Sequence, residues 1–291
     1  MTNSDAVVSV RDLRKNYGSF GALNGVSFDI QRGETFALLG PNGAGKSTTI
    51  EILEGYRDRT SGEASVLGVD PQHGGIPWKA RLGIVLQDTG ESGDVTVQEQ
   101  LSHFARYYPN PRSVDEVIAW VGLEQKAKTL IRKLSGGQRR RVDVALGIIG
   151  RPELLFLDEP TTGFDPEARR NFWGLIDQLK REGATILLTT HYLDEAAHLS
   201  DRAGIIAGGK LIDIGRISEI GGADARIPIV RWTDASGQQQ QRTNEPGAVV
   251  ADLVKRIGEP KDLEVVRPSL EDVYLDLVRE YDKESELEAA K

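Results

Sequence analysis

The sequence predicts an α/β fold: a mostly parallel sheet with crossover helices, an antiparallel β-rich entry, a helical insert and a small C-terminal α+β appendage. Apolar runs at 35–39, where only the first residue (Thr35) is polar, and at 154–157 are typical of strands that are buried on both faces of a sheet. Helical stretches separate most runs of this kind, as the crossovers between parallel strands require. Near residues 221–222 the pattern changes to shorter elements. These three observations predict the architecture.

The composition indicates a packed core and argues against several classes of function. The 291 residues, 39% hydrophobic and 27% charged, suffice for one large domain with an appendage. The net charge of -8 argues against a nucleic-acid partner, because duplex binding depends on surplus Lys and Arg. The absence of cysteine excludes disulfides and thiolate nucleophiles. We interpret the one dense basic cluster, 139–141, as the solvated face of a helix.

The sequence gives no sign of a membrane segment. Residues 1–10 lack the basic region and apolar core of a signal peptide. The apolar runs all fall well short of the roughly 18 residues that span a bilayer. We therefore expect the chain to be soluble by itself.

The N-terminal part consists of β-like segments that glycine turns separate. Residues 7–10 and 26–30 are rich in β-branched and aromatic residues, and Gly18, Gly25 and Gly33 provide turn signals. We expect these segments to form the antiparallel entry. Further buried strands are predicted at three apolar runs, 82–86, 185–189 and 203–206.

A glycine-rich loop follows the run 35–39 and precedes a helix that should begin near Lys46. The loop consists of Gly40, Pro41, Asn42, Gly43, Ala44, Gly45, Lys46 and Ser47, with Thr48 next. Glycines let backbone N–H groups approach phosphate oxygens without interference from side chains. Lys46 would reach the β- and γ-phosphates, and the Ser47 hydroxyl would face Mg²⁺. The motif predicts that residues 40–48 bind a nucleoside triphosphate.

An acid pair ends the apolar run 154–157. Asp158, at the end of a buried strand, would hold Mg²⁺ through water. Glu159 is one residue further on and can point at the γ-phosphate. Because hydrolysis needs a group that orients and polarises water, Glu159 is the candidate catalytic base.

A second glycine-rich helix start, Leu-Ser-Gly-Gly-Gln at 134–138, lies inside a predicted helical insert from about 88 to 150. Ser135 is a favourable N-cap, and the exposed N–H groups behind it form an anion site. The helix that follows has apolar residues at helical spacing: Val142, Ala145, Leu146 and Ile149. Taken alone, the pattern is explained by simple helix capping.

The order of these motifs resembles that of the ATP-binding-cassette (ABC) ATPases, from residue 7 to about 220. The resemblance implies a P-loop NTPase core that uses ATP and Mg²⁺. It also implies that the signature residues Ser135, Gly137 and Gln138 of one subunit close over the γ-phosphate held by the P-loop of the other.

The same resemblance assigns roles to further residues. Tyr17 matches the aromatic residue that stacks on adenine, and Gln87 matches the glutamine that touches Mg²⁺. Asp165 matches the dimer-interface loop, where Phe164 replaces the usual Leu. His191 matches the switch histidine at the γ-phosphate, so that it joins Glu159 and Lys46 in catalysis.

The domain boundary is expected after residue 222, which gives an ATPase domain at 1–222 and an accessory domain at 223–291. The latter should contain a hairpin across 234–237, a helix, a strand at 263–266 and a final helix capped by Ser269 and Asp272. The segment 268–274 resembles the C-terminal part of antibiotic and multidrug exporter subunits. Residues 54–55 and 160–163 also fit that branch.

The resemblance therefore implies an energy-coupling subunit that powers an ABC exporter from the cytoplasmic face of the membrane. Its partners would be a separate multi-span permease and a second copy or paralogue of the ATPase. Two alternatives stay open: a soluble ABC ATPase in a non-transport assembly, and a nucleotide-binding regulator with a degenerate site, which intact Lys46, Asp158, Glu159 and His191 oppose. Substrate contacts of this family lie in the membrane subunit, so the transported molecule is not predicted.

Overall fold

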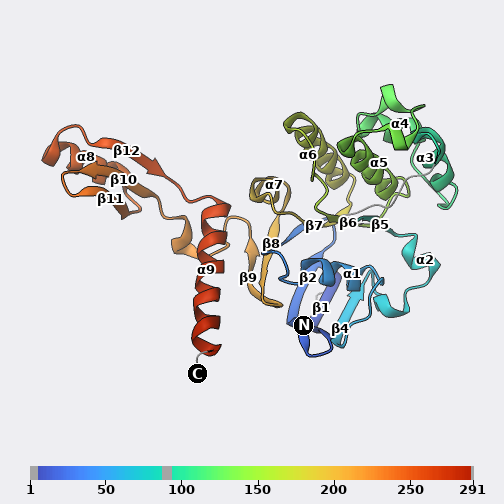
Figure 1. Cartoon of the computed structure of the whole chain (residues 1–291), viewed down its shortest axis with the longest axis horizontal. Helices are drawn as coiled ribbons and strands as arrows, with labels where there is room; N and C mark the ends of the chain where they lie inside the picture. The colour runs from blue at the N-terminus through green and yellow to red at the C-terminus, as the bar shows by residue number, and fades with distance from the viewer. Residues whose placement is uncertain (1–5, 87–93, 290–291) are drawn as a thin grey trace. The chain divides into compact units, whose positions relative to one another are not determined.

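The computed structural model describes residues 6–86 and 94–289 and divides the chain into two compact units. Unit 1 is Met1–Ile214 and unit 2 is Gly215–Lys291. The division falls within strand β9 (Lys210–Arg216), a few residues before the boundary expected after residue 222. Figure 1 shows the elements of both units.

The large sheet of unit 1 has six strands in the order β5-β6-β7-β3-β8-β9. The strands other than β9 are β3 (Thr35–Leu39), β5 (Leu82–Val85), β6 (Leu154–Asp158), β7 (Thr185–Thr189) and β8 (Arg202–Ala207). The pairs β5–β6, β6–β7, β7–β3 and β3–β8 are all parallel. The predicted, mostly parallel sheet is therefore confirmed.

Both faces of this sheet are buried, which explains the uniformly apolar strands. In β6, Leu154 and Phe156 belong to a core cluster shared with the N-terminal strands. Leu155 and Leu157 belong to a second cluster shared with the helices of the insert. Because successive side chains of a strand point to opposite faces, an unbroken apolar run fits such a position.

A three-stranded antiparallel sheet in the order β2-β1-β4 forms the predicted β-rich entry. Its strands are β1 (Ala6–Tyr17), β2 (Phe20–Gln31) and β4 (Ser61–Val66). Helix α1 (Lys46–Leu53) contacts β2, β4 and β6, and so lies between the two sheets. The sequence does not predict β4 or β9. Both are edge strands with few buried side chains, so they lack the apolar pattern of an interior strand.

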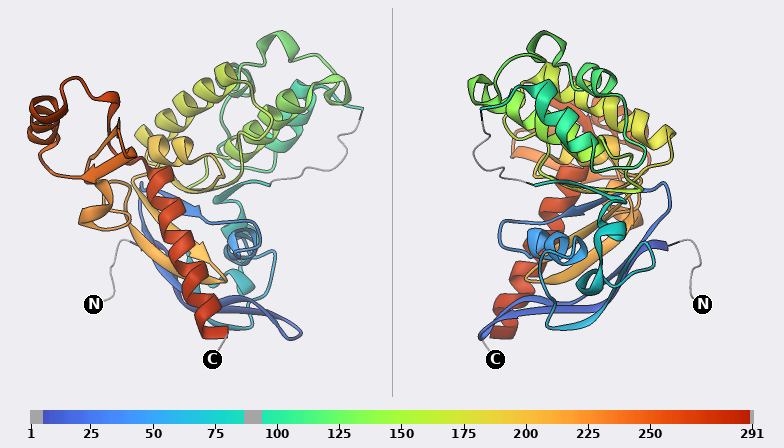
Figure 2. Two further views of the ribbon diagram at one scale, coloured as in Figure 1. Left: turned by 60° about the vertical axis from the view of Figure 1, so that its left-hand side comes forward. Right: turned by 90° about the vertical axis from the view of Figure 1, so that its right-hand side faces the viewer.

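Helices cover the opposite face of the large sheet, and Figure 2 shows this layer from two sides. They are α3 (Val97–Ala105), α4 (Val114–Trp120), α5 (Gly136–Ile148), α6 (Pro166–Arg181) and α7 (Leu193–Leu199). The short α2 (Ile76–Lys79) precedes β5. Helices α3 to α5 form the predicted insert. Among residues 6–86 and 94–289, no helix is both long and apolar enough to cross a membrane.

Unit 2 contains a three-stranded antiparallel sheet in the order β11-β10-β12, together with two helices. Its elements are β10 (Ile229–Asp234), β11 (Gly237–Arg242), α8 (Pro246–Ile257), β12 (Lys261–Val266) and α9 (Leu270–Ala289). The predicted hairpin is present, with Asp234 paired to Gly237. The predicted cap of the last helix is also present, because the Asp272 N–H donates to the Ser269 hydroxyl while Asp272 accepts from the Ser269 N–H.

Candidate functional site

The P-loop leaves the carboxyl end of β3, a fully buried strand between β7 and β8. Two of its glycines are required by close packing. A Cβ on Gly40 would lie 2.2 Å from the carbonyl oxygen of Ile206, and one on Gly45 would lie 2.6 Å from Leu23. Gly45 is also the N-cap of α1 with a φ of 108°, which glycine adopts readily and other residues do not. The backbone is thereby held open around the start of α1.

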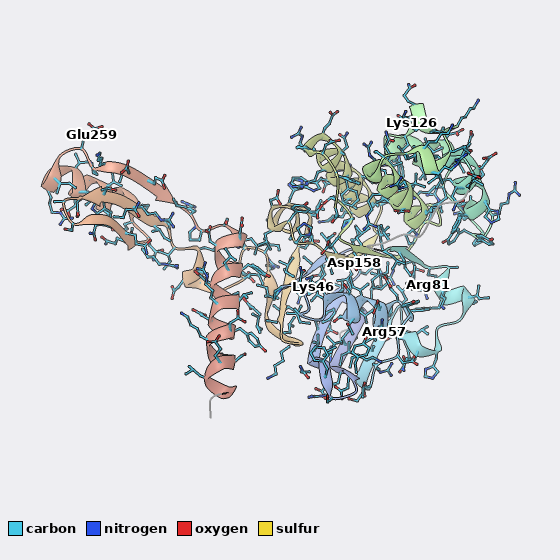
Figure 3. All side chains as sticks on the ribbon, in the orientation of Figure 1. Lys46, Arg57, Arg81, Lys126, Asp158 and Glu259 are labelled. Carbon is cyan, nitrogen blue, oxygen red and sulfur yellow. The ribbon has the colours of Figure 1, made fainter. Side chains whose placement is uncertain are left out.

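Lys46 lies in the first turn of α1 and is buried. Its ammonium donates to the carbonyl oxygens of Gly40, at 2.7 Å, and Pro41, at 3.1 Å. Burial lowers the pKa of Lys46, whereas the nearby carboxylates of Glu159 and Asp158 oppose that shift. Figure 3 shows Lys46 close to Asp158, where the strands of the large sheet end. The ammonium thus points into the P-loop, where phosphates would bind.

Asp158 ends β6 and is buried, and its carboxylate accepts a hydrogen bond from the Thr189 hydroxyl. Asp158 and Ser47 line one cavity of about 520 Å³. A hydroxyl and a carboxylate are the hard oxygen donors that Mg²⁺ prefers, and this ion keeps several waters and phosphate ligands. Within the described part of the chain, no group of three or more His or acidic side chains could hold a metal ion. The donor set therefore fits Mg²⁺ that arrives with a nucleotide.

Glu54 lines the same cavity and is buried. Burial raises the pKa of Glu54 to about 8, and the charges of Asp158 and Glu51 add to the shift. The folded protein therefore holds the Glu54 carboxyl protonated at neutral pH, beside the candidate magnesium ligands.

The variant Glu54→Gln is expected to stabilise the nucleotide-free protein at pH 7 and to flatten its pH dependence. Between the unfolded pKa of 4.5 and the folded pKa of about 8, the folded state binds more protons than the unfolded state. The free energy of unfolding of the wild type should therefore fall as pH rises through this window, by at most about 1.4 kcal/mol per unit. Urea unfolding at pH 5, 6, 7 and 8 measures the slope.

Glu34 provides the matched control, since it is also buried but is paired with Arg202 at 3.1 Å. Glu34→Gln should keep the wild-type slope between pH 5 and 8. If Glu54→Gln kept that slope as well, the raised pKa of Glu54 would be wrong.

Glu159 follows β6 in a left-handed backbone conformation, with a φ of 48°. A non-glycine residue in this region costs on the order of 1–3 kcal/mol and persists only where surrounding contacts enforce it. The Glu159 N–H donates to the carbonyl oxygen of Thr189 at 3.1 Å and to its hydroxyl at 3.2 Å. The side chain lies 3.3 Å from Nδ1 of His191 and accepts from Thr162 at 3.4 Å. The turn thus places the carboxylate beside His191.

The signature begins α5 as a capped helix start. The Ser135 hydroxyl accepts from the Gln138 N–H at 3.3 Å, and the Gln138 side chain accepts from the Ser135 N–H at 3.1 Å. The predicted N-cap at Ser135 is confirmed, with a full capping box. Gly137 lies against the loop at Gly163, where an added Cβ would be 3.0 Å from the carbonyl oxygen.

The signature and the loop that contains Asp165 line a second cavity, of about 680 Å³. All of its lining residues come from α5 and from residues 135 and 162–168. Asp165 itself caps α6 by accepting from the Ala168 N–H at 2.8 Å, and Phe164 packs edge-on against Phe172. The structure thus brings Lys46, Asp158, Glu159 and His191 together, and places Ser135, Gly137 and Gln138 around a different cavity.

Tyr17 ends β1 with 42% of its surface exposed, as a ring available for stacking should be. Lys15 and Arg57 lie 5.1 and 5.4 Å from the ring centre, which adds positive charge near it. The exposed Phe20 pairs with Tyr17 across the first hairpin and offers a second aromatic ring. Gln87, the remaining predicted ligand, lies outside the described residues.

The interpretation of residues 139–141 as a solvated helix face is wrong for the middle arginine. Arg139 is exposed, but Arg140 is buried and donates to carbonyl oxygens of the chain around Asp158 and Glu159. A signal was present in the sequence, since Arg140, Val144 and Ile148 share one face of α5 at spacings of four.

Thr189 is a further site residue, which the sequence pattern does not indicate. It bonds both acids, but only the fold brings it next to them.

Comparisons with known proteins agree with this geometry. A family model described as ABC transporter matches residues 23–162. A Nod factor export ATP-binding protein I from Ralstonia nicotianae is 40% identical over 222 residues, which cover 75% of this chain and 69% of that protein. The linearmycin resistance ATP-binding protein LnrL from Bacillus subtilis is 36% identical over 219 residues, covering 74% and 70%.

The fold is also similar to solved structures. A chain described as the ATP binding subunit of an ABC transporter superimposes with a TM-score of 0.68 at 28% identity. The match covers 74% of this chain and 91% of that chain.

Proposed function

Because this chain belongs to the ABC transporter ATP-binding family, we propose that it powers a membrane exporter of drugs, antibiotics or other lipophilic compounds. The chain is an ABC ATPase, and proteins of this family bind and hydrolyse ATP. Two relatives support the exporter assignment, since their names refer to Nod factor export and to linearmycin resistance.

The observation that carries the proposal is the division of the motifs between two cavities of one chain. Lys46, Asp158 and Glu159 lie around the P-loop, whereas Ser135 and Gly137 line a separate cavity at the start of α5. A helix N-terminus with free N–H groups favours an anion, but this one lines a cavity to which residues 40–48 of its own chain do not contribute. Two chains arranged head to tail would bring each signature to the other's P-loop. We therefore infer a dimer with two composite sites.

The side chains around the P-loop have separable tasks in hydrolysis. The N–H groups of 40–48 and the Lys46 ammonium bind the β- and γ-phosphates. Ser47, Asp158 and Gln87 would hold Mg²⁺, which neutralises charge on the phosphates when bound. Glu159 would orient and polarise the attacking water, and His191, 3.3 Å from that carboxylate, would contact the γ-phosphate.

The composite site couples chemistry to motion. ATP bound at one P-loop is also contacted by the partner's signature, so its binding favours the closed dimer. Removal of the γ-phosphate deletes the contact that both halves share, and the dimer can open. The exporter would use this cycle of closure and opening.

A separate multi-span permease at the cytoplasmic face of the membrane is the inferred partner. Tyr56, Ile84 and Leu86 are exposed apolar side chains around the cavity that contains Ser47 and Asp158. Clustered exposed apolar residues are typical of interaction surfaces. A permease segment that docks on this surface would lie next to the cavity that contains Ser47 and Asp158, the candidate magnesium ligands. We call these three residues the apolar rim.

Aspartate substitutions in the apolar rim are expected to disconnect the permease without stopping hydrolysis. Tyr56→Asp combined with Ile84→Asp should reduce recovery of the permease on tagged chain at least about tenfold, because a charge would have to be desolvated in the interface. ATP hydrolysis by the purified chain should persist. Glu159→Gln, which leaves the rim intact, should recover the permease at the wild-type level. Equal recovery with both variants would exclude the apolar rim as the docking surface.

The experiment that tests the transport function is purification of the tagged chain from detergent-solubilised membranes, with the neighbouring reading frame co-expressed. We expect stoichiometric recovery of a protein with about six apolar spans of about 20 residues each. Inside-out vesicles should then accumulate a lipophilic drug with ATP, and Lys46→Ala should abolish that uptake. Recovery as a free cytosolic dimer, or in a ribosomal or cofactor-assembly complex, would instead favour the non-transport alternative.

A further inference from the structure

The guanidinium of Arg140 is buried at the junction of three segments of unit 1. Nε donates to the carbonyl oxygen of Pro160 at 3.1 Å. One terminal nitrogen donates to the carbonyl oxygens of Asp158, at 2.5 Å, and Glu159, at 3.1 Å. The other donates to the carbonyl oxygen of Leu86, directly after β5. Arg140 therefore joins the first turns of α5 to the ends of both β5 and β6.

These contacts hold the backbone of Glu159 from its carbonyl side. Thr189 accepts from the Glu159 N–H, and Arg140 donates to the Glu159 carbonyl, so the polar groups on both sides of its Cα are fixed. The left-handed φ of 48° lies between these two anchors. A side chain's direction follows from its backbone conformation, so the same anchors set where the carboxylate points.

A buried arginine destabilises the folded protein unless its N–H groups donate hydrogen bonds, because its charge is removed from water. Burial lowers the pKa of Arg140, while Asp143, Asp158 and Glu159 favour its charged form. A planar guanidinium with five N–H donors can serve several carbonyls that converge from different directions, whereas an ammonium offers three donors from one point. The chemistry of Arg140 thus fits an anchor of several main-chain segments.

We propose that Arg140 is a positioning residue for hydrolysis, which fixes the backbone of Glu159 and ties it to the signature helix of the same chain. Arg140 lies five residues after Ser135 on α5. A displacement of the signature by a partner is therefore passed to the carbonyls around Glu159 without an intervening loop. This inference rests on the proposed catalytic role of Glu159, and it adds a link between the signature and the catalytic acid of one chain.

The test is kinetic and uses the full-length chain with ATP and Mg²⁺. Arg140→Met should lower kcat by about 10- to 100-fold, since small displacements of a catalytic group have effects of this size. The Kd of ATP, measured by fluorescence titration, should stay within about twofold of the wild type, because Arg140 bonds main-chain carbonyls and does not line the cavity that contains Ser47 and Asp158. Arg140→Lys should give a smaller loss of kcat, since three donors replace five.

Arg112 is the matched control for loss of a buried arginine. Arg112 is buried in the same unit, donates to the carbonyl oxygen of Ile148 at the far end of α5, and pairs with Glu182. Arg112→Met should lower the melting temperature but leave kcat per folded molecule within about twofold of wild type. If the two methionine variants lost kcat equally, Arg140 would have only a structural role. If Arg140→Met does not fold, Arg140→Lys takes its place in the comparison with Arg112→Met. The kcat of Arg140→Lys must then fall while its Kd for ATP stays unchanged.

A double-variant cycle separates the failure of this inference from that of the proposed function. In single-turnover assays, Arg140→Met added to Glu159→Gln should slow hydrolysis no further, because both changes act through one carboxylate. If the rate loss of the double variant equalled the product of the losses of the two single variants, the inference would be overturned. Normal turnover in the single variant Glu159→Gln would refute the proposed catalytic role of Glu159. Slow turnover in Glu159→Gln, together with a normal kcat in Arg140→Met, would refute only the inference about Arg140.

Discussion

Glu159→Gln is expected to lower kcat for ATP hydrolysis by about 10²- to 10⁴-fold, the range that a general base contributes. The amide cannot take a proton from water, yet it keeps the size of the carboxylate and its contact with Thr162. ATP affinity should therefore stay close to that of the wild type. Steady-state phosphate release and ATP titration on the purified chain measure the two quantities.

The same variant should accumulate as a closed dimer when ATP and Mg²⁺ are present, because binding favours closure and hydrolysis no longer reverses it. Size-exclusion chromatography with and without ATP detects this state. Glu153→Gln is the control, since Glu153 lies just before β6 and pairs with Arg81 and Arg32. It should keep wild-type kcat with a stability loss of at most about 1 kcal/mol. Wild-type turnover in Glu159→Gln would remove Glu159 from its catalytic role.

Ser135→Arg is expected to abolish hydrolysis while leaving ATP binding by the monomer largely intact. The long cationic side chain would fill the cavity at the start of α5 and oppose the positive end of its helix dipole. In a composite site this prevents a partner's phosphate from reaching the signature. We expect kcat to fall at least about 100-fold, with the Kd of ATP within about twofold of wild type.

Two further variants separate this effect from loss of the helix cap. Ser135→Ala removes the cap without adding bulk, at a cost of about 1 kcal/mol in stability. Ser113→Arg places arginine at the exposed N-cap of α4, in the same insert, and should leave kcat unchanged. Loss of ATP binding by the Ser135→Arg monomer would show that the signature acts within its own chain.

Mixing two inactive variants gives the sharpest test of the composite site. Ser135→Arg has an intact P-loop, and Lys46→Ala has an intact signature. In a two-fold dimer the mixed species contains one complete site, so an equal mixture should recover about a quarter of wild-type sites. If each chain formed a complete site by itself, the mixture would hydrolyse ATP no faster than either inactive variant does alone.

The local parts of this protein could be predicted from the sequence. The runs 35–39 and 154–157 form β3 and all but the last residue of β6, because strands buried on both faces need apolar side chains throughout. The caps at Ser135 and Ser269 depend on residues three positions apart, so they are visible in the sequence. The glycine-rich loop at 40–47 is also visible in the sequence, although the atoms that exclude a Cβ at Gly40 and Gly45 belong to Ile206 and Leu23, which are distant in the chain.

Edge strands and the hydrogen-bond acceptors of buried charges could not be predicted in this way. Strands β4 and β9 have mixed burial, because each lies at the edge of its sheet, and their sequences carry no periodic signal. Arg140 looks like part of a solvated basic cluster when read beside Arg139 and Arg141. Its acceptors lie 18 to 54 residues away in the chain, so only the folded backbone reveals them.

The sequence by itself predicts which residues bind a nucleotide, because a glycine loop, a lysine, an acid pair and a capped helix start each act through near neighbours. The tertiary structure alone decided how these residues are grouped. It placed Thr189 against Asp158, 31 residues away, and His191 against Glu159, and it gave Ser135 a cavity of its own. The physical reason is range: propensity and capping act over a few residues, whereas a site is assembled by packing between segments that are distant in the chain.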